Sequence, residues 1–402
     1  MKKIVLVAFG GILLLGCGNS HDVMYDGLPQ HPAYQMEKPI PTDRNDETFK
    51  EIKENPFVEV ASQPVSTFSV DVDRAAYSNI RRMIQQGTFP PKDAVRIEEM
   101  INYFDYDYPT PDAQTPSPLR VSYEQAPAPW NSTHQLLRIG LKTKPLDLSN
   151  TPPSHLVFLI DISGSMADYN KLPLLKSSLK LLLSNLKAGD KVSIVTYASG
   201  TRVALEPTSV REREKIEKIL DGLEAGGATS GEQGIQLAYE QAHKAFIKGG
   251  NNRIILATDG DFNIGINNPN DLKAFVEKQR ERGVYLSVLG FGMGNYRDDM
   301  AETLADSGNG NYAYIDNLTE AKKVLVNEFG GTLFTVAKDV KLQIEFNPKY
   351  VKQYKLLGYE NRMLANEDFT NDKKDAGEIG AGHTVTAIYE IVPSDGKVTS
   401  SL

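Results

Sequence analysis

The middle of the chain carries five oxygen-bearing side chains of the types that bind hard metal ions. They are the carboxylates and hydroxyls of Asp161, Ser163, Ser165, Thr229 and Asp259. The first three form a D-x-S-x-S sequence directly after the apolar run 155–160. The threonine stands in the glycine-rich turn 226–231, and the last aspartate follows the apolar run 253–257. Oxygen ligands of low total charge suit Mg²⁺, so the set predicts a site for Mg²⁺, or for Mn²⁺ or Ca²⁺.

The elements that would position these side chains alternate between strands and helices. Apolar, β-branched runs predict strands that are buried on both faces at 155–160, 191–197, 253–257 and 284–289. Segments of helical period predict helices at 172–186, 211–221, 231–247, 271–282 and 318–329. This order predicts a doubly wound, mostly parallel, Rossmann-like α/β sheet. Ligands of such sheets bind outside the carboxyl ends of the strands, so the five candidate residues would meet at one edge.

In their order, the five residues resemble the metal-ion-dependent adhesion site of von Willebrand factor type A (VWA) domains. The resemblance implies that Ser163, Ser165 and Thr229 coordinate the metal. Asp161 and Asp259 would then act largely through bound waters. It also implies that the sixth coordination position of the metal is open for an Asp or Glu carboxylate of a protein partner. The positive metal attracts this negative carboxylate. No catalytic residue is implied, so we expect a binding protein and not an enzyme.

The segments on both sides of the α/β block alternate apolar and polar residues, as half-buried antiparallel strands do. They lie at 119–125, 135–142, 340–346 and 384–391. We expect these flanks to form a β-rich, sandwich-like domain into which the VWA domain is inserted. Helices are expected at 74–86 and from residue 93 onward, and the polar segment 361–382 is expected to be a long surface loop.

The N-terminus has the features of a lipoprotein signal peptide. Lys2 and Lys3 precede an apolar run, 4–15, that is too short to cross a bilayer, and Gly16-Cys17 follows. This sequence resembles a lipobox, in which the cysteine is lipidated after cleavage, and Cys17 is the single cysteine of the chain. We therefore expect a lipid-anchored protein of the cell envelope. Gly18 after the cysteine favours the outer membrane over the inner one.

Further segments resemble a family of bacterial lipoproteins that join a VWA domain to an N-terminal module and a characteristic C-terminal region. They are 66–73 and 95–104 on the N-terminal side, and 357–362 and 375–383 on the C-terminal side. The expected parts are a signal peptide (1–16), a flexible tether (17–55), the N-terminal VWA-associated module with β strands (56–152), the VWA domain (153–332) and a C-terminal β-rich region (333–402). Family members commonly continue further, so we expect the last region to be truncated.

Charge and motif spacing weigh against other classes of function. The formal net charge is −8, and an acidic surface repels phosphate backbones, so no nucleic-acid partner is expected. No lysine follows the turn 226–229 at the P-loop spacing, which argues against a nucleotide. One alternative is a VWA domain that serves as a metal-free scaffold in an envelope complex. A weaker one is a phosphatase-like hydrolase that uses Asp71 and Asp73, although a structural, helix-capping role for these aspartates is favoured.

Overall fold

The computed structural model describes residues 47–70, 73–112, 117–145, 150–228, 233–260, 266, 268–371 and 376–394. Cys17, Asp71 and Thr229 lie outside these ranges, as do the expected signal peptide and most of the expected tether. All of these described residues belong to one compact unit. Within the described ranges, no helix combines the length and the apolar character needed to cross a bilayer.

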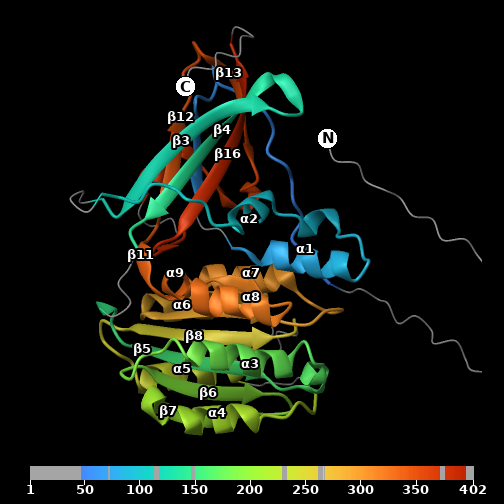
Figure 1. Cartoon of the computed structure of the whole chain (residues 1–402), viewed down its shortest axis with the longest axis vertical. Coiled ribbons are helices and arrows are strands. Elements are labelled where there is room, and N and C mark those ends of the chain that lie inside the picture. Colours follow the sequence, from blue (N-terminus) through green and yellow to red (C-terminus); the bar gives the residue numbers. More distant parts are fainter. Residues whose placement is uncertain are drawn as a thin grey trace, which may run out of the picture. The chain divides into compact units, whose positions relative to one another are not determined.

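A six-stranded sheet forms the centre of the α/β block (Figure 1). Its strands are β5 Ser154–Asp161, β6 Lys191–Tyr197, β7 Thr201–Ser209, β8 Asn251–Thr258, β9 Val284–Gly290 and β10 Tyr312–Tyr314. They lie in the order β10-β9-β8-β5-β6-β7, and every neighbouring pair is parallel except β6 with the edge strand β7. The predicted doubly wound, mostly parallel sheet is confirmed.

Helices cover both faces of this sheet. They are α3 Leu172–Leu183, α4 Arg213–Asp221, α5 Gly234–Lys244, α6 Pro269–Glu281, α7 Asp298–Ser307 and α8 Leu318–Lys322. Because successive side chains of a strand point to opposite faces, β5 contributes to two cores. Phe158 packs into the core of α3, α4 and α8, and Leu159 packs into that of α5, α6 and α7. All residues of β5 and β8 are buried as a result.

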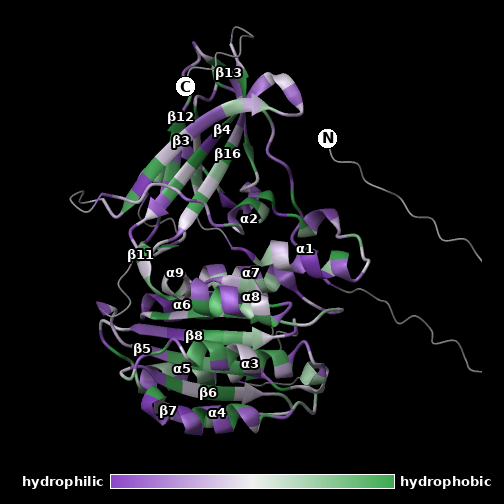
Figure 2. Cartoon of the chain, viewed as in Figure 1, coloured by the Kyte–Doolittle hydropathy of each residue, from purple (hydrophilic) through white to green (hydrophobic). Residues whose placement is uncertain are grey.

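Antiparallel strands from both flanks form the β-rich part. They are β1 Val58–Glu59, β2 Val65–Ser69, β3 Leu119–Ala128, β4 Asn131–Thr143, β11 Thr335–Ala337, β12 Lys341–Glu345, β13 Val351–Leu357, β14 Met363–Leu364, β15 Ile379–Gly380 and β16 Thr384–Pro393. The larger sheets have the orders β1-β13-β16-β4-β3 and β12-β2-β14. Phe68 of β2 meets Tyr389 of β16 with ring centroids 6.3 Å apart, so the two sheets share one core. Figure 2 shows apolar and polar residues alternating along β3 and β4.

Two short helices, α1 Ala75–Gln85 and α2 Ile97–Asn102, connect the two parts, because α1 contacts β10 and α2 contacts β16 (Figure 1). The Ala76 amide at the start of α1 donates to Glu99 Oε2 at 2.8 Å. The Oδ1 atom of Asp73 accepts a hydrogen bond from the Tyr312 amide at 2.9 Å and is buried. Asp73 therefore ties the start of α1 to the edge strand of the α/β sheet.

Two sequence-based expectations are wrong. The segment 361–382 is not one long loop, because β14 pairs with β2 and β15 pairs with β11 within it. The helix expected from residue 93 onward is broken. A 3₁₀ turn, Lys92–Ala94, comes first, and Val95 is extended before α2 begins. The strands β7, β10 and β13 and the helix α7 were not expected, because each is either short or lacks a continuous apolar run.

One buried histidine predicts a loss of stability in mild acid. His155 of β5 has no exposed surface, and its Nε2 atom lies 2.9 Å from Ser193 Oγ. Burial lowers the pKa of His155 from 6.5 to about 4, so the unfolded chain binds a proton at pH 5 that the folded chain excludes. The contribution of neutral His155 to the free energy of unfolding is therefore present above pH 6.5 and is lost as the pH falls toward 4. The expected loss from His155 between pH 7 and pH 5 is about 2 kcal/mol.

Urea denaturation followed by far-UV circular dichroism at both pH values measures this loss. His155→Gln cannot titrate and retains a hydrogen-bond donor for Ser193, so the variant should lose less stability than the natural chain over the same pH interval. Equal losses in the two proteins would show that other groups cause the acid sensitivity.

Candidate metal-ion site

The two aspartates of the predicted site lie at the carboxyl ends of neighbouring strands. Asp161 is the last residue of β5, and Asp259 directly follows β8. These strands pair in parallel register, with Ile160 opposite Ala257. After β5 the chain adds β6 and β7 on one side of β5, and it then adds β8, β9 and β10 on the other side. The strand order therefore reverses direction between β5 and β8. A doubly wound sheet opens a ligand crevice at such a point.

The D-x-S-x-S loop gathers its oxygen atoms on one side. Asp161 Oδ1 accepts a hydrogen bond from the Ser163 amide at 2.8 Å, which turns the chain back over the strand end. A 3₁₀ turn, Gly164–Ala167, then brings Ser165 Oγ to 3.0 Å from Ser163 Oγ. Ser163 is buried and Ser165 is exposed, so the pair of hydroxyls extends from the sheet edge to solvent.

The glycine-rich turn is tied to this loop by two backbone hydrogen bonds. The Gly164 amide donates to Gly227 O at 2.9 Å, and the Gly226 amide donates to Ile162 O at 2.8 Å. Gly227 has a φ of +81°, and a Cβ atom there would lie 2.3 Å from Ser199 Oγ, so this position requires glycine. The described part of the turn ends at Ala228. Thr229 follows it and lies outside the described residues.

Two buried carboxylate oxygens of the site have no hydrogen-bond partner among the residues that the structure describes. They are Asp161 Oδ2 and Asp259 Oδ1, and neither side chain has any exposed surface. Burial raises the pKa of Asp161 to about 6, and the charge of Asp259 adds to this rise while hydrogen bonds from Ser163 oppose it. Leaving buried anionic oxygens unpaired is costly, and a cation beside them would remove that cost. The donor set therefore fits a small divalent cation.

Two residues that sequence reasoning missed complete the surroundings of the aspartates. Lys171, just before α3, has only 7% of its side chain exposed, and its Nζ atom donates to Asp259 Oδ2 at 2.8 Å. Gly292 makes room for this lysine, since a Cβ atom there would lie 2.3 Å from Lys171 Cε. Tyr197 ends β6 and is fully buried. Burial and then the charge of Asp161 raise its pKa well above the usual value, so its hydroxyl stays protonated.

No local pattern marks these two residues. Lys171 lies in a polar turn of ordinary composition, and Tyr197 ends an apolar strand as a core residue would. Within the described ranges, no group of three His, Cys, Asp or Glu residues could hold a metal ion, so a cation at this edge would need hydroxyl ligands as well. Asp73 of the hydrolase alternative is engaged by Tyr312, and Asp71 lies outside the described residues.

Family models match three successive parts of the chain. The von Willebrand factor model matches residues 43–138, the von Willebrand factor type A domain model matches 155–327, and the model named "Uncharacterized protein YfbK, C-terminal" matches 331–401. The chain is thus a VWA-domain protein with a YfbK-type C-terminal region. The resemblance to VWA domains noted in the sequence is confirmed.

The chain is similar to three curated proteins. The chain is 49% identical over 356 residues to the uncharacterized protein YfbK of Escherichia coli, covering 87% of this chain and 62% of that protein. It is 30% identical to the uncharacterized protein sll0103 of Synechocystis, covering 50% and 47%, respectively. It is 29% identical to inter-alpha-trypsin inhibitor heavy chain H4 of Bos taurus, covering 36% and 17%. The chain is therefore homologous to YfbK and spans less than two thirds of the length of each of these relatives.

Proposed function

We propose that this chain is a cell-envelope lipoprotein whose VWA domain binds a divalent cation, with Mg²⁺ favoured over Mn²⁺ and Ca²⁺. Through the cation it would bind an acidic group of a protein partner. The observation that carries the proposal is a pair of buried oxygens, one on Asp161 and one on Asp259, that have no partner within the described ranges. They lie next to the paired hydroxyls of Ser163 and Ser165. This arrangement supports adhesion or assembly and does not call for a catalytic residue.

In this proposal, each part of the site has a separate task. The hydroxyls of Ser163, Ser165 and Thr229 bind the cation, and Asp161 and Asp259 hold its waters and balance its charge. Neutral hydroxyl ligands leave the ion a net positive charge, which draws in a carboxylate from an Asp or Glu of the partner. VWA domains commonly bind divalent metal and mediate protein interactions, and this chemistry is consistent with both properties.

The proposed location depends on Cys17. Lipidation of this residue would anchor the chain to the membrane, with the outer membrane favoured over the inner one. Of the expected tether, 17–55, only the part before residue 47 would then link the anchor to the binding domain. Residues 47–55 belong to the folded part, because Ile52 is buried and Glu47 Oε2 pairs with Arg82 Nη2 at 2.8 Å.

Titration calorimetry tests the cation site directly. The chain from Gly18 onward keeps every described residue, and it should bind Mg²⁺ or Mn²⁺ in a saturable way. Asp161→Ala should abolish this binding, because it removes a buried charge that faces the cation. The matched control is Asp221→Ala, which removes the same charge from an exposed pair with Lys180 and should leave the binding intact.

Circular dichroism of each variant shows whether it has folded. Binding that is lost in folded Asp161→Ala and kept in Asp221→Ala supports the cation site. A folded natural chain that binds none of Mg²⁺, Mn²⁺ and Ca²⁺ would overturn the proposal.

One observation favours the alternative of a metal-free scaffold. The ammonium group of Lys171 already neutralises one carboxylate of the site from within the protein. In that alternative, the ammonium group of Lys171 takes the place of a metal ion as the positive charge beside Asp259. The same titration separates the two functions, because a scaffold would show no saturable binding of any of the three cations.

A further inference from the structure

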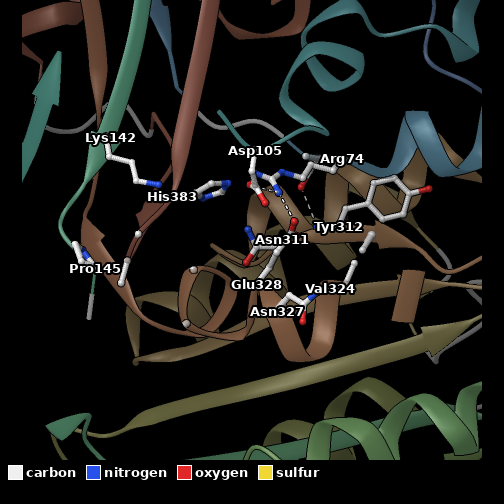
Figure 3. Close-up of a pocket in the computed structure, with 16 residues that line it drawn as sticks. Arg74, Asp105, Lys142, Pro145, Asn311, Tyr312, Val324, Asn327, Glu328 and His383 are labelled. Atoms are coloured by element: carbon white, nitrogen blue, oxygen red, sulfur yellow. Dashed lines mark hydrogen bonds and ion pairs between the residues drawn. The ribbon is translucent and has the colours of Figure 1, made fainter. Parts of the chain in front are cut away.

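A cavity of about 430 Å³ lies where the start of α1, the end of β4 and the α/β block meet, away from the Asp161 edge. Figure 3 shows Lys142 and His383 directed into it from the β-rich side, and Arg74 from the opposite side. The backbone of Gly330 and Gly331 forms another part of its wall. A volume of this order is typical of sites that enclose a small molecule.

Three nitrogen donors of this cavity lack an acceptor among the described residues. Lys142 and the ring of His383 make no side-chain hydrogen bond there, and Arg74 Nε is buried without a partner. The Arg74 side chain is only 11% exposed, so bulk water does not readily compensate for the missing bond. The cavity is therefore bordered by the nitrogens of Lys142 and His383 on one side and, on the opposite side, by the guanidinium group of Arg74, whose buried Nε is unpartnered.

Within the described ranges, the acidic side chains around the cavity accept no hydrogen bond from Lys142, the His383 ring or Arg74 Nε. Glu328 is already bound by both Arg74 Nη1 and Lys323 Nζ. Asp73, which also lines the cavity, accepts from the Tyr312 amide and lies 3.5 Å from Arg362 Nη2. Asp105 lies at the rim with 78% of its side chain exposed, and its Oδ1 atom is 3.8 Å from Arg74 Nη1, a distance at which an exposed pair contributes little. Space and donors remain for an anion from outside the chain.

The surroundings of His383 indicate a positive potential inside the cavity. Burial lowers the pKa of His383 to about 3, and the charges of Arg74, Lys323 and Lys142 lower it further. The imidazole is therefore neutral at pH 7 and offers one N–H as a donor. An anion placed beside it would be attracted by the same three cations.

The rest of the wall carries the apolar side chains of Val324, Ala313, Pro145 and Ala381 together with the amides of Asn311 and Asn327. Its apolar part suits a short hydrocarbon body, which an inorganic ion lacks. We propose that the cavity is a binding site for a small organic carboxylate, with its charged group between Lys142, His383 and Arg74 and its carbon chain against the apolar wall. The site is separate from the VWA edge and does not depend on a metal.

Calorimetric titration with sodium hexanoate tests this proposal, with hexanamide and sodium phosphate as comparison probes. Hexanoate should bind in a saturable way. Lys142→Met and His383→Gln should each weaken that binding roughly tenfold, as expected for the loss of one charged or polar bond to a carboxylate. Lys355→Met is the matched control, because it removes the same charge from β13, outside the cavity, and should not change the affinity.

The comparison probes decide the class of ligand. Hexanamide should bind much more weakly than hexanoate, because it lacks the charge. The absence of hexanoate binding to the natural chain would overturn the proposal, and so would hexanoate binding that Lys142→Met leaves unchanged. Phosphate that binds as tightly as hexanoate and depends equally on Lys142 would overturn the assignment to an organic carboxylate.

Discussion

Arg96→Met is expected to lower the free energy of unfolding by about 3–5 kcal/mol, because it leaves two buried carboxylates without their cation. Arg96 is 2% exposed and pairs with Asp298 at 2.6 Å and with Glu99. Asp298 begins α7 of the α/β block, whereas Arg96 precedes α2 of the flanking module. The ion pair therefore also joins the two parts of the protein.

The expected loss depends on pH. Burial raises the pKa of Glu99 to about 7, although Arg96 opposes this rise, so removal of Arg96 should raise it further. A buried carboxyl with a raised pKa costs stability as the pH rises from its unfolded pKa, 4.5, to its folded pKa, so a higher folded pKa extends this cost to higher pH. We expect Arg96→Met to cost more stability at pH 8 than at pH 6.

Urea denaturation followed by far-UV circular dichroism at both pH values measures the effect. Trp130, the single tryptophan, is 59% exposed and is a poor probe of the core. The control is Arg213→Met, which breaks an exposed pair with Glu217 on α4 and should cost less than about 1 kcal/mol. Similar losses in the two variants would show that the buried network contributes little.

Lys171→Met is expected to increase the affinity for Mg²⁺ roughly tenfold or more. Its ammonium group lies 2.8 Å from Asp259 Oδ2, so it places a positive charge beside the proposed cation. Removing that charge makes the donor set more negative, and like-charge repulsion in a buried site is strong. The metal-free protein should become less stable, because Asp259 is then buried without a partner. Added Mg²⁺ should restore this stability, since binding to the folded chain alone stabilises it.

Calorimetry and thermal unfolding with and without MgCl₂ measure the two effects separately. Lys180→Met removes the same charge from α3, at an exposed pair with Asp221, and should change neither quantity. A lower Mg²⁺ affinity in Lys171→Met would mean that the lysine holds Asp259 in the binding arrangement and does not compete with the cation. Loss of stability that Mg²⁺ does not restore would count against a cation at this edge.

Local patterns predicted most of the α/β block. The apolar runs at 155–160 and 253–257 became β5 and β8, since burial on both faces requires apolar residues at every position. The D-x-S-x-S sequence was recognisable because its residues are close in the chain. The alternation along β4 and β16 likewise predicted strands, but not that the two strands pair with each other.

The sequence by itself determined the type of each long element, the VWA class and the candidate ligands, because these depend on neighbouring residues and their periodicity. The meeting of Asp161 with Asp259 at one sheet edge and a β-rich part built from both flanks were both expected from the sequence. The tertiary structure alone decided the strand pairings that produce them, and it alone brought Lys171 to Asp259. The cavity around Lys142 and His383 arises in the same way. Contacts between residues far apart in the chain depend on strand order and packing, and one sequence carries no local signal for either.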